Sequence, residues 1–226
     1  MTSGLEVRSC RNGGRPPGLR ATLATLLVGA AAVGALAAQN PPAAGQRAGG
    51  AAPPQGQGRG RASIQLMTLT TMGWADGGVI PAKFSQAGHD VSPALAWTNA
   101  PDTAASFTLI VHDLDAPIGS GTDDVLQWMV WNIPGAARSL PEGVPQGAEL
   151  ADGTRQISVT GPNYRGPAAP ATGPAHHYVF ELFALDAKLD VAPVGAAPAA
   201  TRAAVAAAMA GHIRGKATMI GLYKRQ

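Results

Sequence analysis

The sequence predicts a mainly β protein, an antiparallel β-sandwich with one helix near the C-terminus. Several short segments alternate apolar and polar residues or are rich in β-branched and aromatic residues, which is typical of strands. Turns rich in Gly and Pro separate these segments, and the one strong helical pattern is an Ala-rich stretch late in the chain. Strands without helices between them favour antiparallel sheets over βαβ units.

Seven segments carry the strand pattern. In chain order they are Ile64–Thr70, Ala94–Trp97, Ser106–His112, Val125–Ile133, Gln156–Thr160, His177–Leu185 and Thr218–Tyr223. The helical pattern lies between the last two segments, with Thr201 as a candidate N-cap before strong helix formers and Gly215 as a candidate stop. We therefore expect strands from residue 64 onward and a single late helix.

The distribution of charge divides the 226-residue chain at about residue 62. Residues 1–62 contain seven Arg, one acidic residue, no aromatic residue and no His. Residues 63–226 contain 10 basic and 13 acidic residues, so the basic character of the whole chain belongs to its N-terminal segment. We expect one domain over residues 63–226, which are long enough to bury a core. Its lack of a basic excess excludes nucleic-acid binding as the main function.

Residues 1–37 have the three parts of a secretory signal peptide. Four Arg precede the uncharged apolar run ATLATLLVGAAAVGA over residues 21–35, and Ala35-Leu36-Ala37 offers a cleavage site with small residues. The alternative is a retained transmembrane anchor, although the run is rich in Ala and Gly and only weakly hydrophobic. We expect cleavage, no stable membrane span in the mature protein, and a periplasmic or secreted location.

Residues 38–62 have the composition of a linker, rich in Pro, Gly, Ala and Gln. We expect a disordered spacer, and a basic arm that contacts anionic envelope surfaces is the alternative. The single cysteine, Cys10, precedes the apolar run. We therefore expect no disulfide, no cysteine-based metal site and no lipoprotein anchor.

Two carboxylates end the predicted strand Ser106–His112. Asp113 and Asp115 are two residues apart, a spacing that places both on one face of an extended strand. Asp113 continues the face on which the apolar residues of the strand lie, so its carboxylate needs partners. Two interpretations are open: the pair belongs to a ligand site, or it caps a turn through Asx hydrogen bonds.

A second polar pair lies at the start of the predicted strand His177–Leu185. His176 and Tyr178 share a face above apolar residues, which suits binding of a small anion through an imidazole and a phenol. A hydrogen-bonded strand entry is the alternative. The preceding loop, Gly161–Pro174, is stiffened by prolines, and Gly166 could bring a backbone amide close to a ligand.

No motif indicates catalysis or a bound cofactor. The histidines show no zinc-type spacing, so we expect no metal site and no cofactor. The sequence contains no nucleophile elbow, no phosphate-binding P-loop and no dinucleotide fingerprint. Ser120 lies beside the acidic turn but has no recognisable base partner. No catalytic residue is predicted, and we do not expect an enzyme.

Four motifs, in order along the chain, resemble those of the phosphatidylethanolamine-binding protein family. The segment Asp113–Pro117 (DLDAP) resembles its D-P-D-A-P signature, and Ser92–Trp97 (SPALAW) resembles its S-P-x-L-x-W entry. Gly166-Pro167, followed by His176-His177-Tyr178, resembles its second signature. The tail over residues 208–225 resembles the bacterial branch called YbhB/YbcL or Raf-kinase-inhibitor-like. The resemblance covers roughly residues 64–226.

The resemblance implies a large sheet packed on a smaller one, with a pocket at one end that binds phosphate-type groups, including phospholipid head groups. The implied ligand-binding residues are Asp113, Asp115, Gln127, Gly166, Pro167, His176 and Tyr178. Gln127 is a departure, because the family usually has His at its place. A neutral amide can donate a hydrogen bond but does not become a cation, so we expect weaker and less pH-sensitive anion binding.

We therefore expect a secreted or periplasmic binding protein for small anionic ligands or phospholipid head groups. Because an ionised carboxylate repels phosphate, we expect Asp113 to orient His176 or Tyr178, or to meet the ammonium of an ethanolamine head group. Two alternatives remain. One is a protein-interaction module such as a serine protease inhibitor, an activity that the family includes. The other is a hydrolase that uses Asp113, His176 and Ser120.

Overall fold

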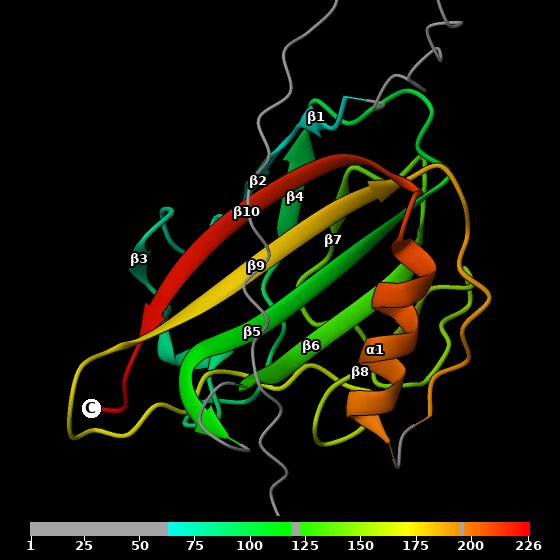
Figure 1. Ribbon diagram of the computed structural model, residues 1–226. Helices are drawn as coiled ribbons and strands as arrows, with labels where there is room; N and C mark the ends of the chain where they lie inside the picture. The colour runs from blue at the N-terminus through cyan, green and yellow to red at the C-terminus, as the bar shows by residue number, and fades with distance from the viewer. Residues whose placement is uncertain (1–62, 119–122, 195–196) are drawn as a thin grey trace, which may run out of the picture. The chain divides into compact units, whose positions relative to one another are not determined.

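The computed structural model describes residues 63–118, 123–194 and 197–226. The expected signal peptide over residues 1–37 and the expected linker over residues 38–62 lie outside the described residues, as does Ser120. The described part has three layers: a small sheet, a large sheet and one helix (Figure 1).

The large sheet has an antiparallel centre and short parallel additions at one edge. Its strands are β1 (Gln65–Leu66), β3 (Gly78–Val79), β5 (Ser106–Ile118), β6 (Asp123–Pro134), β8 (Arg155–Ile157), β9 (His176–Leu185) and β10 (Ile213–Tyr223). The order is β1-β10-β9-β5-β6-β8, and β3 also pairs with β10. β1 and β3 are parallel to β10, whereas all other pairs are antiparallel. The predicted fold class is confirmed, and the two-residue parallel strands are too short for a sequence pattern to indicate.

The small sheet contains β2 (Thr68–Thr70), β4 (Leu95–Thr98) and β7 (Ser139–Leu140), all antiparallel. A short 3-10 turn, η1 (Ala82–Phe84), precedes β4. The single strand predicted over residues 64–70 contributes to both sheets, as β1 and then β2. Met67 lies between them, buried, and its N–H donates to the Lys216 carbonyl at 2.9 Å. This segment therefore closes one side of the sandwich.

The main hydrophobic core lies between the two sheets. Alternate residues of β5, such as Phe107 and Leu109, point into it and meet Leu95 and Trp97 of β4. The Trp97 and Phe107 rings pack with their centroids 5.2 Å apart. This alternation is the period-2 pattern that predicted the strands, and it fixes which side chains of β5 and β9 face the small sheet.

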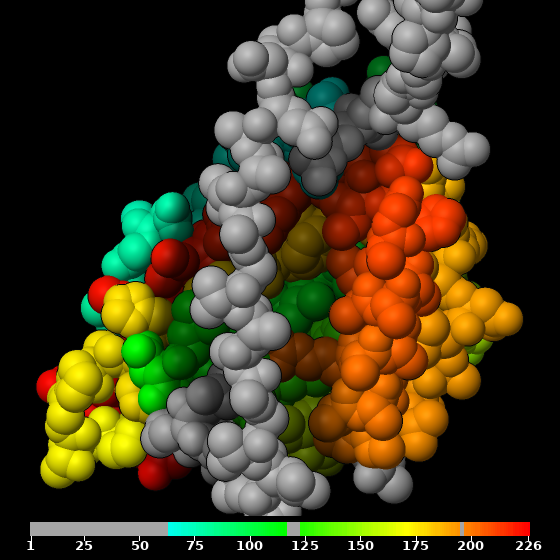
Figure 2. Space-filling model, viewed as in Figure 1, coloured from blue at the N-terminus to red at the C-terminus, as the bar shows by residue number. Residues whose placement is uncertain are grey.

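Helix α1 (Pro198–Met209) lies on the opposite face of the large sheet (Figure 1), and Figure 2 shows it in orange over one side of that face. Val205 and Met209 of α1 are buried in a second core cluster with Ile110 of β5 and Trp131 of β6. In the parts of the chain that the structure describes, no helix is long and apolar enough to cross a membrane.

The helix begins and ends earlier than the sequence predicted. It begins at Pro198, so the expectation that Thr201 is the N-cap is wrong, and Thr201 lies buried inside the helix. A proline in the first turn needs no hydrogen-bond partner for its nitrogen, which favours the earlier start. The helix ends at Met209, and Gly211 follows in the left-handed region with φ of 84°. Gly215, the predicted stop, lies inside β10.

Candidate functional site

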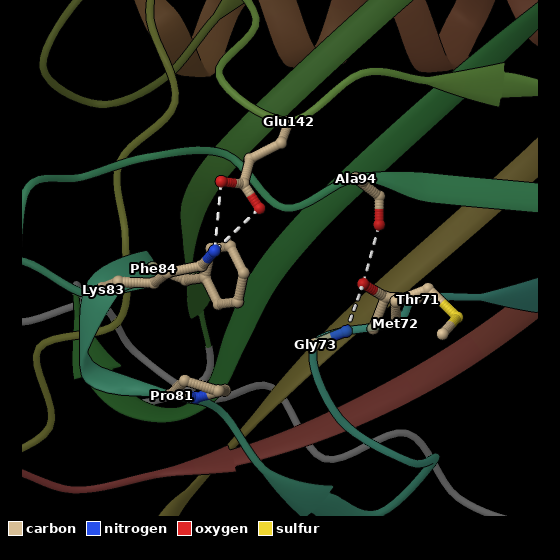
Figure 3. Close-up of a pocket in the computed structure, with 8 residues that line it drawn as sticks. All are labelled: Thr71, Met72, Gly73, Pro81, Lys83, Phe84, Ala94 and Glu142. Atoms are coloured by element: carbon tan, nitrogen blue, oxygen red, sulfur yellow. Dashed lines mark hydrogen bonds and ion pairs between the residues drawn. The ribbon is translucent and has the colours of Figure 1, made fainter.

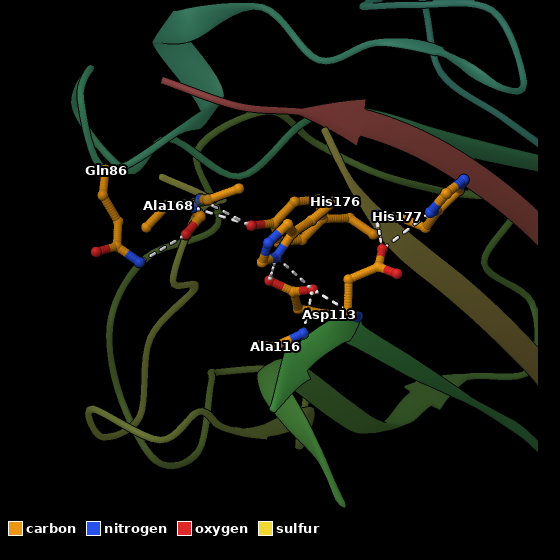
Figure 4. A network of polar contacts seen from close by, with 10 residues as sticks. Gln86, Asp113, Ala116, Ala168, His176 and His177 are labelled. Atoms are coloured by element: carbon orange, nitrogen blue, oxygen red, sulfur yellow. Dashed lines mark hydrogen bonds and ion pairs between the residues drawn. The ribbon is translucent and has the colours of Figure 1, made fainter. Parts of the chain in front are cut away.

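Asp113 in the second half of β5 meets His176 at the start of β9. His176 Nδ1 lies 2.9 Å from Asp113 Oδ2 and 3.1 Å from Oδ1 (Figure 4). The carboxylate is buried, with 3% of the residue exposed. An ionised carboxylate only accepts hydrogen bonds, so Nδ1 carries the proton and donates. Nε2 is then the imidazole nitrogen that remains for a ligand.

Asp113 also caps the turn that follows it. The backbone N–H groups of Asp115 and Ala116 donate to Asp113 Oδ1 at 3.0 and 3.2 Å. The Asx-turn interpretation of Asp113 is therefore confirmed, and the same carboxylate also binds His176. With two amides and an imidazole as donors, the buried charge is well compensated.

Asp115 belongs to a different contact. Its Oδ2 accepts from the His177 backbone N–H at 2.5 Å and lies 2.9 Å from His177 Nδ1. Asp115 is exposed, and the hydrogen bond from the His177 backbone lowers its pKa. His176 and His177 are consecutive in β9 and point to opposite faces of the sheet. The prediction that Asp113 and Asp115 share one face is therefore wrong, because the pairing of β5 is irregular between Asp113 and Ile118 and the regular alternation of its side chains is interrupted there.

Tyr178 lies directly opposite Asp113 in the β5–β9 ladder and is buried. Its phenol oxygen accepts hydrogen bonds from the N–H groups of Ala168 and Ala169, both at 3.1 Å (Figure 4). Burial raises the pKa of Tyr178, the two amides oppose this, and the Asp113 charge adds to it. The phenol therefore stays protonated and ties the Gly161–Pro174 loop to β9.

The Gly166-Pro167 segment is held by side chains from the chain between η1 and β4. The Gly166 N–H donates to Asp90 Oδ1 at 3.0 Å. Gln86 Nε2 donates to the Gly166 carbonyl at 2.8 Å (Figure 4). The Gly166 amide, which we expected to face a ligand, is thus occupied by an internal carboxylate. Pro167 is buried, and its carbonyl accepts the Gln86 N–H at 3.0 Å.

The chain approaches Gly166 too closely for a side chain at this position. A Cβ there would overlap the Phe84 carbonyl oxygen and would lie 2.8 Å from the Ser85 Cα and from Asp90 Oδ1. These atoms are mainly backbone and have little freedom to move. Glycine at residue 166 is therefore required by packing, whatever its relation to a ligand.

Gln127 is the extra residue at an irregularity between β5 and β6. In the ladder Val111 is opposite Trp128 and His112 is opposite Leu126, which leaves Gln127 unpaired with β5. Its carbonyl accepts the Arg165 N–H at 3.1 Å, so it lies beside the loop that carries Gly166. Gln127 is 4% exposed, and its Oε1 is buried without a hydrogen-bond partner among the described residues. A buried acceptor of this kind is costly to leave unsatisfied.

A cavity of about 290 Å³ lies elsewhere in the molecule (Figure 3). Its lining residues are Thr71, Met72, Gly73, Pro81, Lys83, Phe84, Ala94 and Glu142. Lys83 Nζ pairs with Glu142 at 2.9 Å at its rim, and both side chains are about half exposed. None of the predicted site residues lines this cavity, so its location does not bear on the Asp113–His176 site.

The sequence identified both residues of the Asp113–His176 contact but missed the residues that hold the Gly161–Pro174 loop. Asp113 and His176 are brought together, with Tyr178 and the Gly166 loop beside them. Asp90 and Gln86 carried no signal, because nothing in a sequence indicates that residues about 80 positions apart are hydrogen-bonded. Within the described residues, no group of three or more His, Cys, Asp or Glu could hold a metal ion.

Residues 70–224 match the family model described as phosphatidylethanolamine-binding protein. The chain belongs to the phosphatidylethanolamine-binding protein family. A UPF0098 protein of Methanothermobacter thermautotrophicus is 39% identical over 165 residues, covering 70% of this chain and 99% of that protein. LppC of Mycobacterium tuberculosis, which is named a lipoprotein, is 33% identical over 165 residues, covering 72% and 74%.

Solved structures agree with this assignment. CT736 of Chlamydia trachomatis, a phosphatidylethanolamine-binding protein homolog, superposes with a TM-score of 0.61 at 30% identity, covering 71% of this chain and 99% of that one. Escherichia coli YbcL gives a TM-score of 0.56 at 24% identity with the same coverage, a likeness that shows the fold. The predicted family, and its YbhB/YbcL branch, are confirmed.

Proposed function

We propose that this protein binds a small ligand with a phosphate-type group at the end of the large sheet where β5 and β9 meet. The observation that carries the proposal is the buried Asp113–His176 pair. The carboxylate accepts a hydrogen bond from the Nδ1–H of His176 and thereby fixes the ring, so that Nε2 is presented in one orientation. A protonated His176 then donates from Nε2 to an anionic oxygen of the ligand.

The partners of Asp113 favour an orienting role for this residue over direct contact with a ligand. Its Oδ1 accepts from two backbone amides, and both of its oxygens lie within hydrogen-bond distance of His176. The carboxylate oxygens of Asp113 therefore have little remaining capacity to accept a hydrogen bond from the ammonium of an ethanolamine head group. The pair of Asp113 and a protonated His176 is neutral overall, which suits a singly charged or zwitterionic ligand better than a dianion.

Two buried polar groups that lack a hydrogen-bond partner in the described part of the chain, one in the Gly161–Pro174 loop and one beside it, suggest which further hydrogen-bonding groups the ligand carries. Gln127 Oε1 is a buried acceptor and Arg165 Nε is a buried donor, and neither has a partner among the described residues. The Arg165 N–H donates to the Gln127 carbonyl, so the two residues are neighbours. A phosphate monoester that keeps one proton presents both a donor and acceptors, and so offers the kind of partner that each group lacks.

The test is a ligand titration of the full chain, followed through backbone amide and imidazole NMR shifts. Phosphate, phosphoethanolamine and phosphocholine are added in turn. We expect saturable shifts at Asp113, Gln127 and His176 that disappear in His176→Ala. The matched control is His177→Ala, because His177 also pairs with an Asp but lies on the opposite face. Shifts that persist in His176→Ala, or their absence at millimolar ligand, would contradict the proposal.

We further propose that the protein acts in the cell envelope or outside the cell. The support is the signal-peptide pattern of residues 1–37 and the name of its relative LppC. N-terminal sequencing of the protein purified from its own cells tests this. A mature chain that begins at residue 38 is expected, and an intact N-terminus in the cytoplasmic fraction would contradict it.

A further inference from the structure

Five charged residues form a chain of ion pairs on the face of the large sheet that carries α1. We call this chain the ionic ladder, and its members are Arg202, Asp124, His112, Glu181 and Lys216. They come from α1, β6, β5, β9 and β10 in turn, so the ladder crosses four strands and reaches the helix. It lies apart from the Asp113–His176 pair, on the opposite side of the sheet.

His112 is the central member, and both of its ring nitrogens face carboxylates. Nδ1 lies 2.5 Å from Asp124 Oδ2, and Nε2 lies 3.3 Å from Glu181 Oε2. The second contact is an ion pair whose geometry is not that of a hydrogen bond. His112 is 8% exposed, so little water reaches either contact.

Both carboxylates are held in their charged form by outer cations. Arg202 donates to both oxygens of Asp124, and Lys216 Nζ lies 2.6 Å from Glu181 Oε1. Burial opposes ionisation of Asp124, but the bonds from Arg202 and His112 outweigh it and lower its pKa to about 2. The contact with His112 lowers the pKa of Glu181 to about 2 against its burial, and Lys216 also lowers it.

This arrangement requires a positively charged imidazole. A neutral ring has one N–H and one lone pair, so one of its nitrogens would present a lone pair to an ionised carboxylate. In the cation both nitrogens carry protons, and both contacts are attractive. The requirement follows from the positions of the two carboxylates and from their negative charge.

We propose that protonated His112 ties the first half of α1 to the large sheet through Asp124 and Arg202, and that deprotonation of His112 loosens this attachment. The apolar contacts of α1 are modest in number, since Val205 and Met209 are its buried apolar side chains. Arg202 is thus the polar link between the helix and the strands. The ladder makes the docking of α1 dependent on pH.

The direction of this dependence follows from the charges around His112. Burial alone would lower the pKa of His112 below 6.5, but Glu181 and Asp124 together outweigh burial and raise it. A raised pKa in the folded state means that the stabilisation is complete below pH 6.5 and is lost as the pH rises through the folded-state pKa. The attachment of α1 is therefore expected to weaken on the alkaline side.

The experiment uses the full chain labelled with 15N-histidine. Long-range 1H–15N spectra between about pH 5.5 and 9.5 report the protonation of each ring nitrogen of His112. We expect both nitrogens to remain protonated to a higher pH than in N-acetylhistidine amide. Amide hydrogen-exchange protection in α1 should fall across the same range, by about tenfold for each unit by which the pKa is raised.

Variants separate the proposal from a general loss of stability. His112→Asn should make the protection of α1 independent of pH, and Asp124→Asn should lower the midpoint of the His112 titration while keeping the imidazole. His89→Asn is the control, because His89 is exposed and forms no ion pair within the described residues. If His112→Asn does not fold, the midpoint of the His112 titration in Asp124→Asn still tests the proposal. A ring nitrogen of His112 without a proton at about pH 5.5, or unchanged α1 protection across the midpoint, would overturn the proposal.

Discussion

His112 and Asp113 are consecutive residues of β5, yet their side chains lie on opposite faces of the large sheet and join separate polar networks. Asp113 contacts His176 on the side of the inter-sheet core, whereas His112 lies between Asp124 and Glu181 on the side of α1. The alternation of a β-strand produces this separation. Each network can therefore be altered by a substitution that leaves the other intact.

Replacing Asp113 by Asn should weaken ligand binding more than it weakens folding. The amide oxygen of Asn can still accept the turn amides of Asp115 and Ala116, but the charge that orients His176 is lost. Loss of one charge-assisted hydrogen bond, about 1.5 kcal/mol, corresponds to roughly tenfold weaker binding. NMR titration with phosphoethanolamine and urea unfolding measure the two effects.

Asp115→Asn is the control for this substitution, because Asp115 contacts His177 on the other face. It should leave the affinity for the ligand unchanged. Unchanged affinity in Asp113→Asn, together with a large loss of stability, would reduce Asp113 to its role as a turn cap.

Replacing Gln127 by His should make binding stronger and pH-dependent. An imidazole becomes a cation as the pH falls through the ordinary pKa of histidine, near 6.5. A charge-assisted hydrogen bond to the ligand is about twice as strong as a neutral one. We expect the variant to bind phosphate more tightly than the wild type at about pH 5.5 and similarly at about pH 8. Calorimetric titration at the two pH values measures this. Equal affinities at the lower pH would show that residue 127 does not contact the ligand.

Replacing Gly166 by Ala should destabilise the protein and displace the loop that carries Pro167. The added methyl group would overlap the Phe84 carbonyl, and overpacking of this kind costs about 1 to 3 kcal/mol. Urea unfolding measures the loss of stability, and the NMR shifts of Asp90 and Tyr178, which contact the loop, show whether it is displaced. Ala171→Ser, at an exposed position on the same loop, should change neither. A variant as stable as the wild type would mean that the loop adjusts freely.

Replacing Asp124 by Asn should reduce stability at about pH 6 but not at about pH 2. Arg202 and His112 overcome burial to lower the pKa of Asp124 from 3.8 to about 2. A lowered pKa means that the stabilisation is present above pH 3.8 and is lost as the pH falls through about 2. Its size is on the order of 2 kcal/mol.

Urea unfolding of wild type and variant from about pH 2 to about pH 6 measures the difference at each pH. Asp123→Asn is the matched control, because Asp123 is exposed and lies next to Asp124 in β6. The control should follow the wild type throughout. A constant difference between Asp124→Asn and the wild type would mean that packing, not charge, explains the loss.

Long strands could be predicted from the sequence because each carries its own pattern. β5, β6 and β9 are long runs rich in apolar, β-branched and aromatic residues, so their presence follows from local chemistry. β3 and β7 contain two residues each and carry no such pattern. They exist because β10 and β4 present free edges beside them. The start of α1 was misjudged because Pro198 and Thr201 both favour a helix N-terminus, and tertiary packing buries Thr201 inside the helix.

The residues of the candidate site show the same division. The strand pattern placed Asp113, His176 and Tyr178 on the face toward the inter-sheet core, because neighbouring side chains of a regular strand alternate between its two faces. What these residues contact depends on the packing of the whole sheet. Asp90 reaches the Gly166 amide, Asp115 turns to His177, and His112 lies between two carboxylates, because these contacts join segments up to 76 residues apart. Local sequence carries no record of such contacts, since they are selected by the packing of the whole sheet.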